Sequence, residues 1–266
     1  MKHICLFAAA LIIATGAFSK SSRKHHSGTK HNTAIVEKPG EETVAHPGEL
    51  RNKQTVNDSV PHELPVANRS GRLSEQDFKE VAEELGVEVA AIKAVVEIEA
   101  GKTHQGFWAE GKPIINFDLS MFRRMAAKNH ISLGKYVHSH PIVFNRPSSA
   151  RYGGQQAAVQ ARLDAARSID NTSGIEGTFW GMFQIGGFNW RKCGAKSIDD
   201  FVYRMSRSER DQLELFANFV RNTGLLEPLK AKNWAAFARG YNGPSYASRR
   251  YHTRLASAYA RHHTGR

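Results

Sequence analysis

The chain has 266 residues, of which 41% are hydrophobic and 23% are charged, and its formal net charge is +12. This composition supplies enough apolar residues for one good core and excludes a chain that is disordered throughout. The single long apolar run, at the N-terminus, excludes a membrane protein with several spans, and the two cysteines exclude a scaffold held together by disulfides.

The first 19 residues have the pattern of a secretory signal peptide. Lys2 and His3 precede an apolar run from Ile4 to Phe18 that contains small residues near its end. A basic start before a short apolar core is typical of an export signal, and an uncleaved membrane anchor is the alternative interpretation. We therefore predict an exported protein, periplasmic or secreted, with no stable membrane span after processing.

Residues 20–70 differ in composition from the rest of the chain. They contain no Phe, Trp or Tyr, and they hold four of the nine prolines. Such a segment buries too little apolar area to offset the entropy of ordering it. We predict a flexible spacer over 20–70 and one folded catalytic domain over 71–266.

Most of the positive charge belongs to the predicted domain. Residues 71–266 carry 28 Lys and Arg against 19 Asp and Glu. An exported basic domain is expected to bind anionic material, and anionic cell-wall polymers with acidic peptides fit this description. The chain has no run of basic residues interleaved with aromatics, so we expect no nucleic-acid partner, and we expect a monomer.

The pattern of the domain is helical. Ser74 and Asp77 form a capping pattern ahead of apolar positions spaced as on one helix face, and Gly86 ends this helix. A second helix is predicted from about Val87 to Ala100. Similar patterns predict helices near residues 159–169, 208–224 and 234–242, and Pro113–Phe117 is a candidate short strand. The predicted fold is therefore mainly α.

Sequence motifs for phosphate loops, dinucleotide binding, zinc peptidases and serine hydrolases are absent. Cys193 has no catalytic histidine near it in sequence, and we interpret it as a lone thiol that is buried or semi-exposed. His138 and His140 lie two residues apart but lack a complete set of metal ligands. We therefore predict no metal site and no cofactor.

Glu99 is the strongest candidate for a catalytic residue. At about 100° per residue, it lies within about 20° of Ile92, in the middle of an apolar stripe, whereas Glu97 lies on the other side of the helix. Burial and the negative end of a helix dipole both raise the pKa of a carboxyl group. A carboxylic acid that stays protonated near neutral pH suits a general acid, although a partly exposed glutamate at a fraying helix end is the alternative.

The segment after Glu99 supports a role in carbohydrate chemistry. Gly101, Gly106 and Gly111 punctuate a loop that carries Phe107 and Trp108. Such a loop can place aromatic faces beside the acid, and aromatic faces suit sugar rings.

Five ordered pieces of the sequence resemble the N-acetylmuramidase domain of phage endolysins and bacterial cell-wall lysins. The first runs from Ile92 to Gly101, followed by Gly106-Phe107 and the segment Gly111–Asp118. The others are Tyr152-Gly153-Gly154 with Arg162-Leu163, the block from Thr178 to Asn189, Cys193-Gly194, and the block from Phe237 to Pro244. Together they cover about Leu73 to Tyr259, and their order and spacing make the match specific.

The resemblance implies a lysozyme-like helical fold and cleavage of peptidoglycan between N-acetylmuramic acid and N-acetylglucosamine. Glu99 matches the catalytic acid of the family. The residues that match the cleft wall are Trp180, Phe183 and Gln184, and those that match the segment facing the acid are Tyr241 and Asn242. Trp180 and Phe183 also fit a core, and a buried Gln184 requires hydrogen-bond partners.

Three residues depart from the family pattern. Ala100 replaces the usual Ser after the acid, Asp118 replaces the usual Glu, and Phe179 replaces the usual Ser before Trp-Gly. Asp118 is a candidate second carboxylate, with Glu97 or no second carboxylate as the alternatives.

The same residues also fit two other functions. A lytic transglycosylase uses a similar helix-end glutamate but leaves a 1,6-anhydro end on muramic acid. A peptidoglycan-binding module with weak or lost catalysis is the third possibility, motivated by the three departures.

Overall fold

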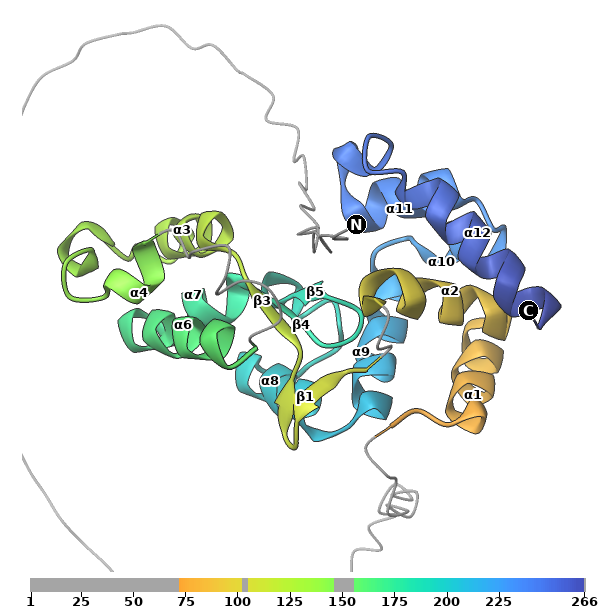
Figure 1. The fold of residues 1–266 in the computed structure, drawn as a ribbon, viewed down its shortest axis with the longest axis horizontal. Coiled ribbons are helices and arrows are strands. Elements are labelled where there is room, and N and C mark those ends of the chain that lie inside the picture. The colour runs from red at the N-terminus through yellow and green to blue at the C-terminus, as the bar shows by residue number, and fades with distance from the viewer. Residues whose placement is uncertain (1–71, 102–104, 146–155, 266) are drawn as a thin grey trace, which may run out of the picture. The chain divides into compact units, whose positions relative to one another are not determined.

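The computed structural model describes residues 72–101, 105–145 and 156–265 (Figure 1). The predicted signal peptide, the predicted spacer and the Tyr152-Gly153-Gly154 motif lie outside the described residues. The described part is mainly helical, as the sequence predicts.

The domain begins with two helices that the sequence patterns predict. Helix α1 (Glu75–Leu85) starts with a capping box in which Ser74 and Asp77 exchange hydrogen bonds, and it ends at Gly86 with φ 63°. Glycine adopts this left-handed conformation without a steric penalty. Helix α2 (Val89–Glu99) ends at Glu99, one residue before the predicted end. The prediction of both helices is confirmed.

Two small antiparallel sheets lie in the middle of the domain (Figure 1). Strands β1 (Phe107–Ala109) and β2 (Lys112–Pro113) form a hairpin. The second sheet has the order β3-β4-β5, with β3 (Ile115–Phe117), β4 (Thr178–Trp180) and β5 (Ile185–Gly186). The predicted single strand at Pro113–Phe117 is therefore two strands, because β2 pairs with β1 and β3 pairs with β4.

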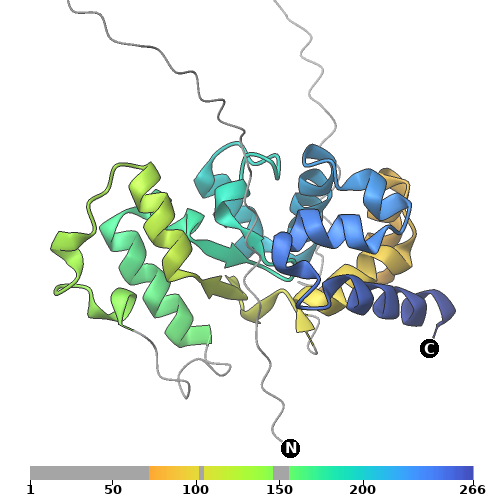
Figure 2. The same ribbon diagram turned by 90° about the horizontal axis from the view of Figure 1, so that it is seen from above.

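Helices lie on both sides of the strands (Figures 1 and 2). The group in green consists of α3 (Leu119–Lys128), η2 (Gly134–Tyr136), α4 (Pro141–Phe144), α6 (Gln156–Ile169) and α7 (Asn171–Glu176). Between β5 and the C-terminus follow η3 (Gly187–Asn189), α8 (Ile198–Arg207), α9 (Glu209–Asn222), α10 (Leu226–Lys230), α11 (Trp234–Asn242), η4 (Pro244–Tyr246) and α12 (Tyr251–Thr264). Helix α12 packs along α2, so the two ends of the domain are joined.

One continuous core connects these elements. It contains the side chains of Ile92, Phe216 and Phe237, all fully buried, together with residues from the strands and from α6 and α12. In the described residues, no helix has the length and apolar character required to cross a membrane.

The turn after β5 leaves no space for a side chain at Gly187. A Cβ atom added there would lie 2.0 Å from the carbonyl oxygen of Ile175, which belongs to the backbone of α7. The segment from Gly187 to Asn189 can therefore approach α7 this closely only with glycine at this position.

We predict that Gly187→Ala lowers the free energy of unfolding by at least about 1–3 kcal/mol, because overpacking against backbone forces a shift. Gly134→Ala is the matched control, since its added Cβ would have no neighbour within 4 Å, and we expect a change within about 1 kcal/mol. Denaturant unfolding of both variants measures the difference. Equal effects would show that the contact at Gly187 does not constrain the fold.

Candidate active site

Glu99 is buried at the C-terminal end of α2. Its relative exposure is 7%, and it lies among Val95, Val96 and Ala100, which are buried as well. The burial predicted from the position of Glu99 on the apolar stripe is therefore confirmed.

The surroundings of Glu99 favour its protonated form. Burial raises the pKa of this carboxyl group from 4.5 to about 7, and it outweighs two opposing influences, the hydrogen bond from Asn242 and the positive charge of Arg254. A carboxyl with a pKa near 7 is protonated in a large fraction of molecules at neutral pH, which is the condition for a general acid.

Asn242, at the end of α11, forms a hydrogen bond with the Glu99 carboxyl. Its Nδ2 donates a hydrogen bond of 2.9 Å to Glu99 Oε1 across 143 residues of sequence. Asn242 is the last residue of α11 and is 4% exposed, and Gly243 follows with φ 79°. Its Oδ1 has no hydrogen-bond partner among the described residues. The pairing of Asn242 with Glu99 agrees with the position that the family pattern assigns to it.

Tyr241 supports this arrangement from within the core. Its ring stacks on Phe237 and contacts Phe216 and Phe219 edge-on. Its hydroxyl donates a 2.6 Å hydrogen bond to the backbone carbonyl of Phe183, so the donor is used inside the protein. Burial raises the pKa of Tyr241 well above its ordinary value. Tyr241 therefore fixes the position of α11 relative to the segment that contains Phe183.

Trp180 and Phe183 are core residues in the folded domain. Trp180 is 3% exposed, and its indole nitrogen donates to the carbonyl oxygen of Ile175. Phe183 is fully buried and stacks on Phe216 with ring centroids 4.3 Å apart. Both side chains therefore stabilise the strands and turn that carry the site, and their exposed area is too small for a direct contact with a sugar.

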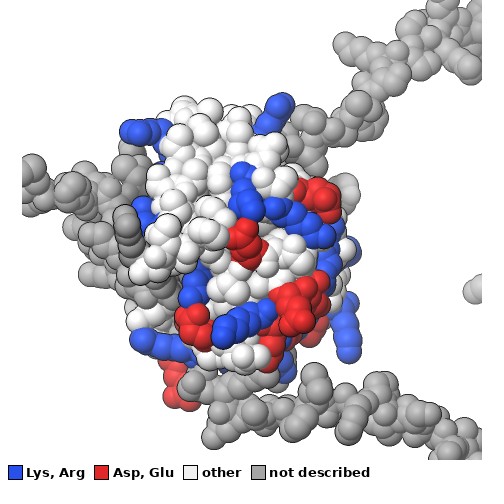
Figure 3. Space-filling model, turned by 90° about the vertical axis from the view of Figure 1, so that its right-hand side faces the viewer, with Lys and Arg blue, Asp and Glu red and all other residues white. Residues whose placement is uncertain are grey.

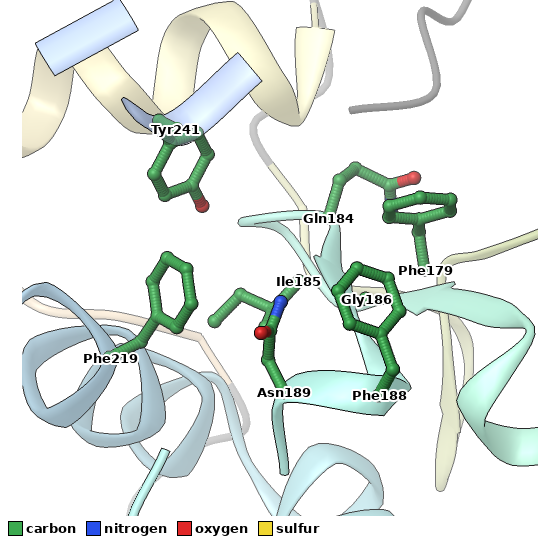
Figure 4. Close-up of a pocket in the computed structure, with 8 residues that line it drawn as sticks. All are labelled: Phe179, Gln184, Ile185, Gly186, Phe188, Asn189, Phe219 and Tyr241. Atoms are coloured by element: carbon green, nitrogen blue, oxygen red, sulfur yellow. The ribbon is translucent and has the colours of Figure 1, made fainter. Parts of the chain in front are cut away.

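Gln184 lies at a tight turn beside a small hollow. Its backbone has φ 47°, and its Nε2 donates a 2.8 Å hydrogen bond to the carbonyl oxygen of Gly181. The hollow is small and has room for about one water molecule. Its lining combines four aromatic rings with two amide side chains (Figure 4): Phe179, Gln184, Ile185, Gly186, Phe188, Asn189, Phe219 and Tyr241.

Asn189 lines the same hollow. It ends the block Thr178–Asn189 that resembles the family, but it was not among the candidate site residues named from the sequence. It is 4% exposed, and its Nδ2 has no hydrogen-bond partner in the described part of the chain. A buried amide without a partner normally requires one. Phe188 and Phe179 meet edge-to-face at 6.2 Å beside it (Figure 4). The hollow therefore offers apolar faces together with an available donor.

Two polar side chains of α9 fix the loops around the site. Glu209 Oε1 accepts a 2.7 Å hydrogen bond from the backbone nitrogen of Gly106, in the loop that follows Glu99. Gln212 Oε1 accepts a 2.8 Å bond from Met182. The sequence carried a signal for Gln212, because it lies one turn before Phe216 on the apolar stripe of this helix.

Phe107 lines a different hollow. It belongs to β1 and, with Trp108, Arg207 and Glu209, borders a larger and more open space of about 450 Å³. It does not line the hollow beside Gln184. The structure therefore places Asn242 and Tyr241 near Glu99. Gln184 lies in the hollow that Tyr241 also lines, and Phe107 lies at a separate surface.

The other two candidate carboxylates have structural contacts. Asp118 is the N-cap of α3, and its Oδ1 accepts a 2.8 Å hydrogen bond from Met121. Glu97 forms an ion pair with Arg261 of α12, and its Oε2 lies 3.0 Å from Nε2 of His262. These contacts explain both residues without a role in chemistry.

The remaining titratable candidates form no metal site in the described residues, where no three of His, Cys, Asp and Glu are grouped to hold an ion. Cys193 is a free, fully buried thiol, as predicted, and burial raises its pKa to about 12.

Comparison with known proteins identifies a matching family and a similar solved structure. The family model for N-acetylmuramidase matches residues 88–263. A solved structure, the crystal structure of the Burkholderia AP3 phage endolysin, is 33% identical with a TM-score of 0.62, and the match covers 74% of each chain. None of the curated proteins matches.

The matched region contains Glu99, Asn242 and the residues around the hollow beside Gln184. Both the family and the endolysin neighbour support the hydrolysis of peptidoglycan as the general activity. Since the family model spans more than half of the sequence, the chain belongs to the N-acetylmuramidase family.

Proposed function

We propose that this protein cleaves the glycan strand of peptidoglycan between N-acetylmuramic acid and N-acetylglucosamine, with Glu99 as the general acid. One observation carries the proposal: the Glu99 carboxyl is buried, is held by Asn242 and has its pKa raised to about 7. An acid in this state can protonate a leaving group near neutral pH.

In the proposed reaction, the Glu99 carboxyl donates its proton to the glycosidic oxygen. The bond from that oxygen to the anomeric carbon of muramic acid breaks, and positive charge builds on the carbon. A water molecule then forms the new bond to this carbon, and its proton returns to the Glu99 carboxylate. The acid is regenerated, and the products are a reducing muramic acid end and a free N-acetylglucosamine hydroxyl.

The hollow beside Gln184 is too small for a sugar. It has room for about one water molecule, whereas pockets for whole small molecules typically measure about 300–1,000 Å³. The Nδ2 of Asn189, which has no hydrogen-bond partner among the described residues, can donate to a water molecule held there. We therefore assign no part of the sugar to this hollow.

Glu99 acts without a second catalytic carboxylate in this proposal. Asp118 is engaged at the N-terminus of α3 and Glu97 is paired with α12. The proposal of export rests on the sequence of residues 1–19, and it places the enzyme in the periplasm or outside the cell. The proposed enzyme is a monomer and uses no cofactor.

The first prediction concerns Glu99→Gln. This variant cannot donate a proton, so we expect release of soluble fragments from purified peptidoglycan to fall by about 10²–10⁴-fold. Asp118→Asn keeps an N-cap and is expected to retain activity within about tenfold. Mass spectrometry of the digest identifies the ends that are formed.

Reducing muramic acid ends would support hydrolysis. Anhydro ends would identify a lytic transglycosylase, and binding without soluble products would identify a binding module. Full activity of a folded Glu99→Gln variant would reject Glu99 as the acid.

The second prediction concerns the pH dependence of activity. Because the pKa of Glu99 is about 7, the fraction of the protonated acid falls about tenfold per pH unit above this value. We expect kcat to fall along the same slope between pH 8 and pH 9. A rate that stays constant across this interval would contradict proton donation by Glu99.

The third prediction concerns stability. Between pH 4.5 and 7 the folded state keeps a proton on Glu99 that the unfolded state releases, so stability falls as pH rises through this window. We expect Glu99→Gln to gain stability relative to the wild type by about 3 kcal/mol from pH 4.5 to pH 8. Urea unfolding measures this gain, and Glu83→Gln, which changes an exposed glutamate of α1, is expected to show none.

A further inference from the structure

Gln212 of α9 is a buried polar residue that the proposed reaction does not use. Figure 3 shows one face of the molecule, on which charged side chains lie at the surface with acids beside cations. Gln212 differs from these residues, because it is fully buried and carries no charge. A buried amide is expected to form hydrogen bonds within the protein, and its partners indicate what it holds in place.

The carboxamide of Gln212 contacts two separate segments near the site. Its Oε1 accepts a 2.8 Å hydrogen bond from the backbone nitrogen of Met182. Its Nε2 donates to the carbonyl oxygen of Met205 at 2.8 Å and to that of Gly106 at 3.3 Å. Gly106 belongs to the loop that follows Glu99. One side chain therefore joins the segment after the proposed acid to the turn at Met182.

Two glycines leave the space that this carboxamide occupies. A Cβ atom added at Gly106 would lie 2.5 Å from Gln212 Oε1, and one added at Gly181 would lie 2.6 Å from the same oxygen. Backbone hydrogen bonds connect both glycines to Ile114, which donates to Gly106 and accepts from Gly181, each at 2.8 Å. Gln212 therefore lies against three connected backbone segments, and a side chain at either glycine would displace its oxygen.

The turn at Met182 is connected to the proposed acid by a short series of contacts. Phe183 follows Met182, and its carbonyl oxygen accepts the 2.6 Å hydrogen bond of Tyr241. Asn242 follows Tyr241 and donates to the Glu99 carboxyl at 2.9 Å. All of these residues are buried, and a close-packed interior transmits displacements. A shift of the turn therefore reaches the amide that holds the acid.

We propose that Gln212 is a positioning residue for the general acid and acts through the turn at Met182 and the amide of Asn242. This inference rests on the proposed function, because it takes Glu99 as the acid. The hydrogen bond from Asn242 lowers the pKa of Glu99. Loss of the Gln212 contacts weakens that bond, so the carboxyl has a higher pKa and a less defined position. A misplacement of about 1 Å can lower a reaction rate about 100-fold.

The first experiment measures kinetics of the full-length protein on soluble glycan fragments of peptidoglycan. Gln212→Met keeps the length of the side chain and removes the amide donor and the carbonyl acceptor. We expect kcat at pH 7 to fall at least about tenfold while KM changes less than about twofold, because the acid moves and the contacts with the sugar stay.

The matched control is Leu163→Ala, which truncates a fully buried side chain of α6. It lowers stability without touching the Gln212 contacts, so we expect kcat of the folded protein to change less than about twofold. Urea unfolding gives the folded fraction of both variants. Equal losses of kcat in the two variants would mean that Gln212 acts through stability alone and would overturn the proposal.

The second experiment does not depend on catalysis. Carbon NMR of labelled glutamate carboxyls follows the titration of Glu99, whose signal is assigned by its absence in Glu99→Gln. We expect the pKa of Glu99 to be higher in Gln212→Met than in the wild type and unchanged in Leu163→Ala. An unchanged or lowered pKa in Gln212→Met would overturn the proposal.

The other ionisable groups that act on Glu99 keep their charge state during this titration. Burial raises the pKa of Tyr241 well above its ordinary value and raises that of Tyr251 to about 12. Arg254 stays charged throughout. A shift in the titration of Glu99 between about pH 5 and 9 therefore reports its contact with Asn242.

Gly106→Ala tests the same contact with Gln212 itself unchanged. The added Cβ meets the side chains of Gln212 and Glu209 and displaces the carboxamide oxygen. We expect the pKa of Glu99 to rise and kcat to fall, as in Gln212→Met. Gly134→Ala, whose Cβ has no neighbour within 4 Å, is expected to change neither. If a folded Gly106→Ala variant kept both values of the wild type, the proposal would be wrong.

Tyr241→Phe interrupts the same series of contacts closer to the acid, because it removes the hydroxyl that binds Phe183. We expect it to raise the pKa of Glu99, and we expect the double variant with Gln212→Met to show only the larger of the two single shifts. Additive shifts would mean two independent routes and would contradict the proposal. Failure of the proposed function is a separate result, since it is measured by the absence of new glycan ends with wild-type protein.

Discussion

The burial of one carboxyl group at the end of α2 is the constraint on which the site depends. Glu99 is 7% exposed and lies on the apolar side of α2. Its raised pKa means that the folded protein favours the protonated form over the charged form. This arrangement costs stability above pH 7, when the group ionises inside the core. The fold thus keeps this carboxyl protonated near neutral pH, and the folded state is less stable than it would be with an apolar residue once the group ionises between α2 and α11.

A buried acid requires fixed neighbours, and distant parts of the chain supply them. Asn242 approaches Glu99 from α11, and Tyr241 ties that helix to the backbone at Phe183. Glu209 and Gln212 of α9 hold the two loops that flank the site. Tyr241, Glu209 and Gln212 each form a hydrogen bond with a backbone group, so removing any one of these side chains leaves an unpaired donor or acceptor. The core and the site are therefore built from the same contacts.

Charge helps to close the domain. Lys232 pairs with Glu88 and Arg261 pairs with Glu97, so cations from the C-terminal part of the chain attach α12 and its neighbours to α2. Exposed ion pairs contribute little stability each. These pairs therefore add to the packing of α12 along α2 and do not replace it.

The sequence by itself determined the helices whose periodicity is strong and whose caps are local, including α1 with Ser74 and α2 with Glu99 on its apolar stripe. It also identified the family, because the order and spacing of its motifs can be read from the sequence alone. Only the tertiary structure decided that Trp180 and Phe183 pack in the core, that Asp118 caps a helix, and that Asn189 lines the hollow. An aromatic or polar side chain has the same local pattern in a core and in a cleft. Which of the two it occupies depends on residues far away in sequence.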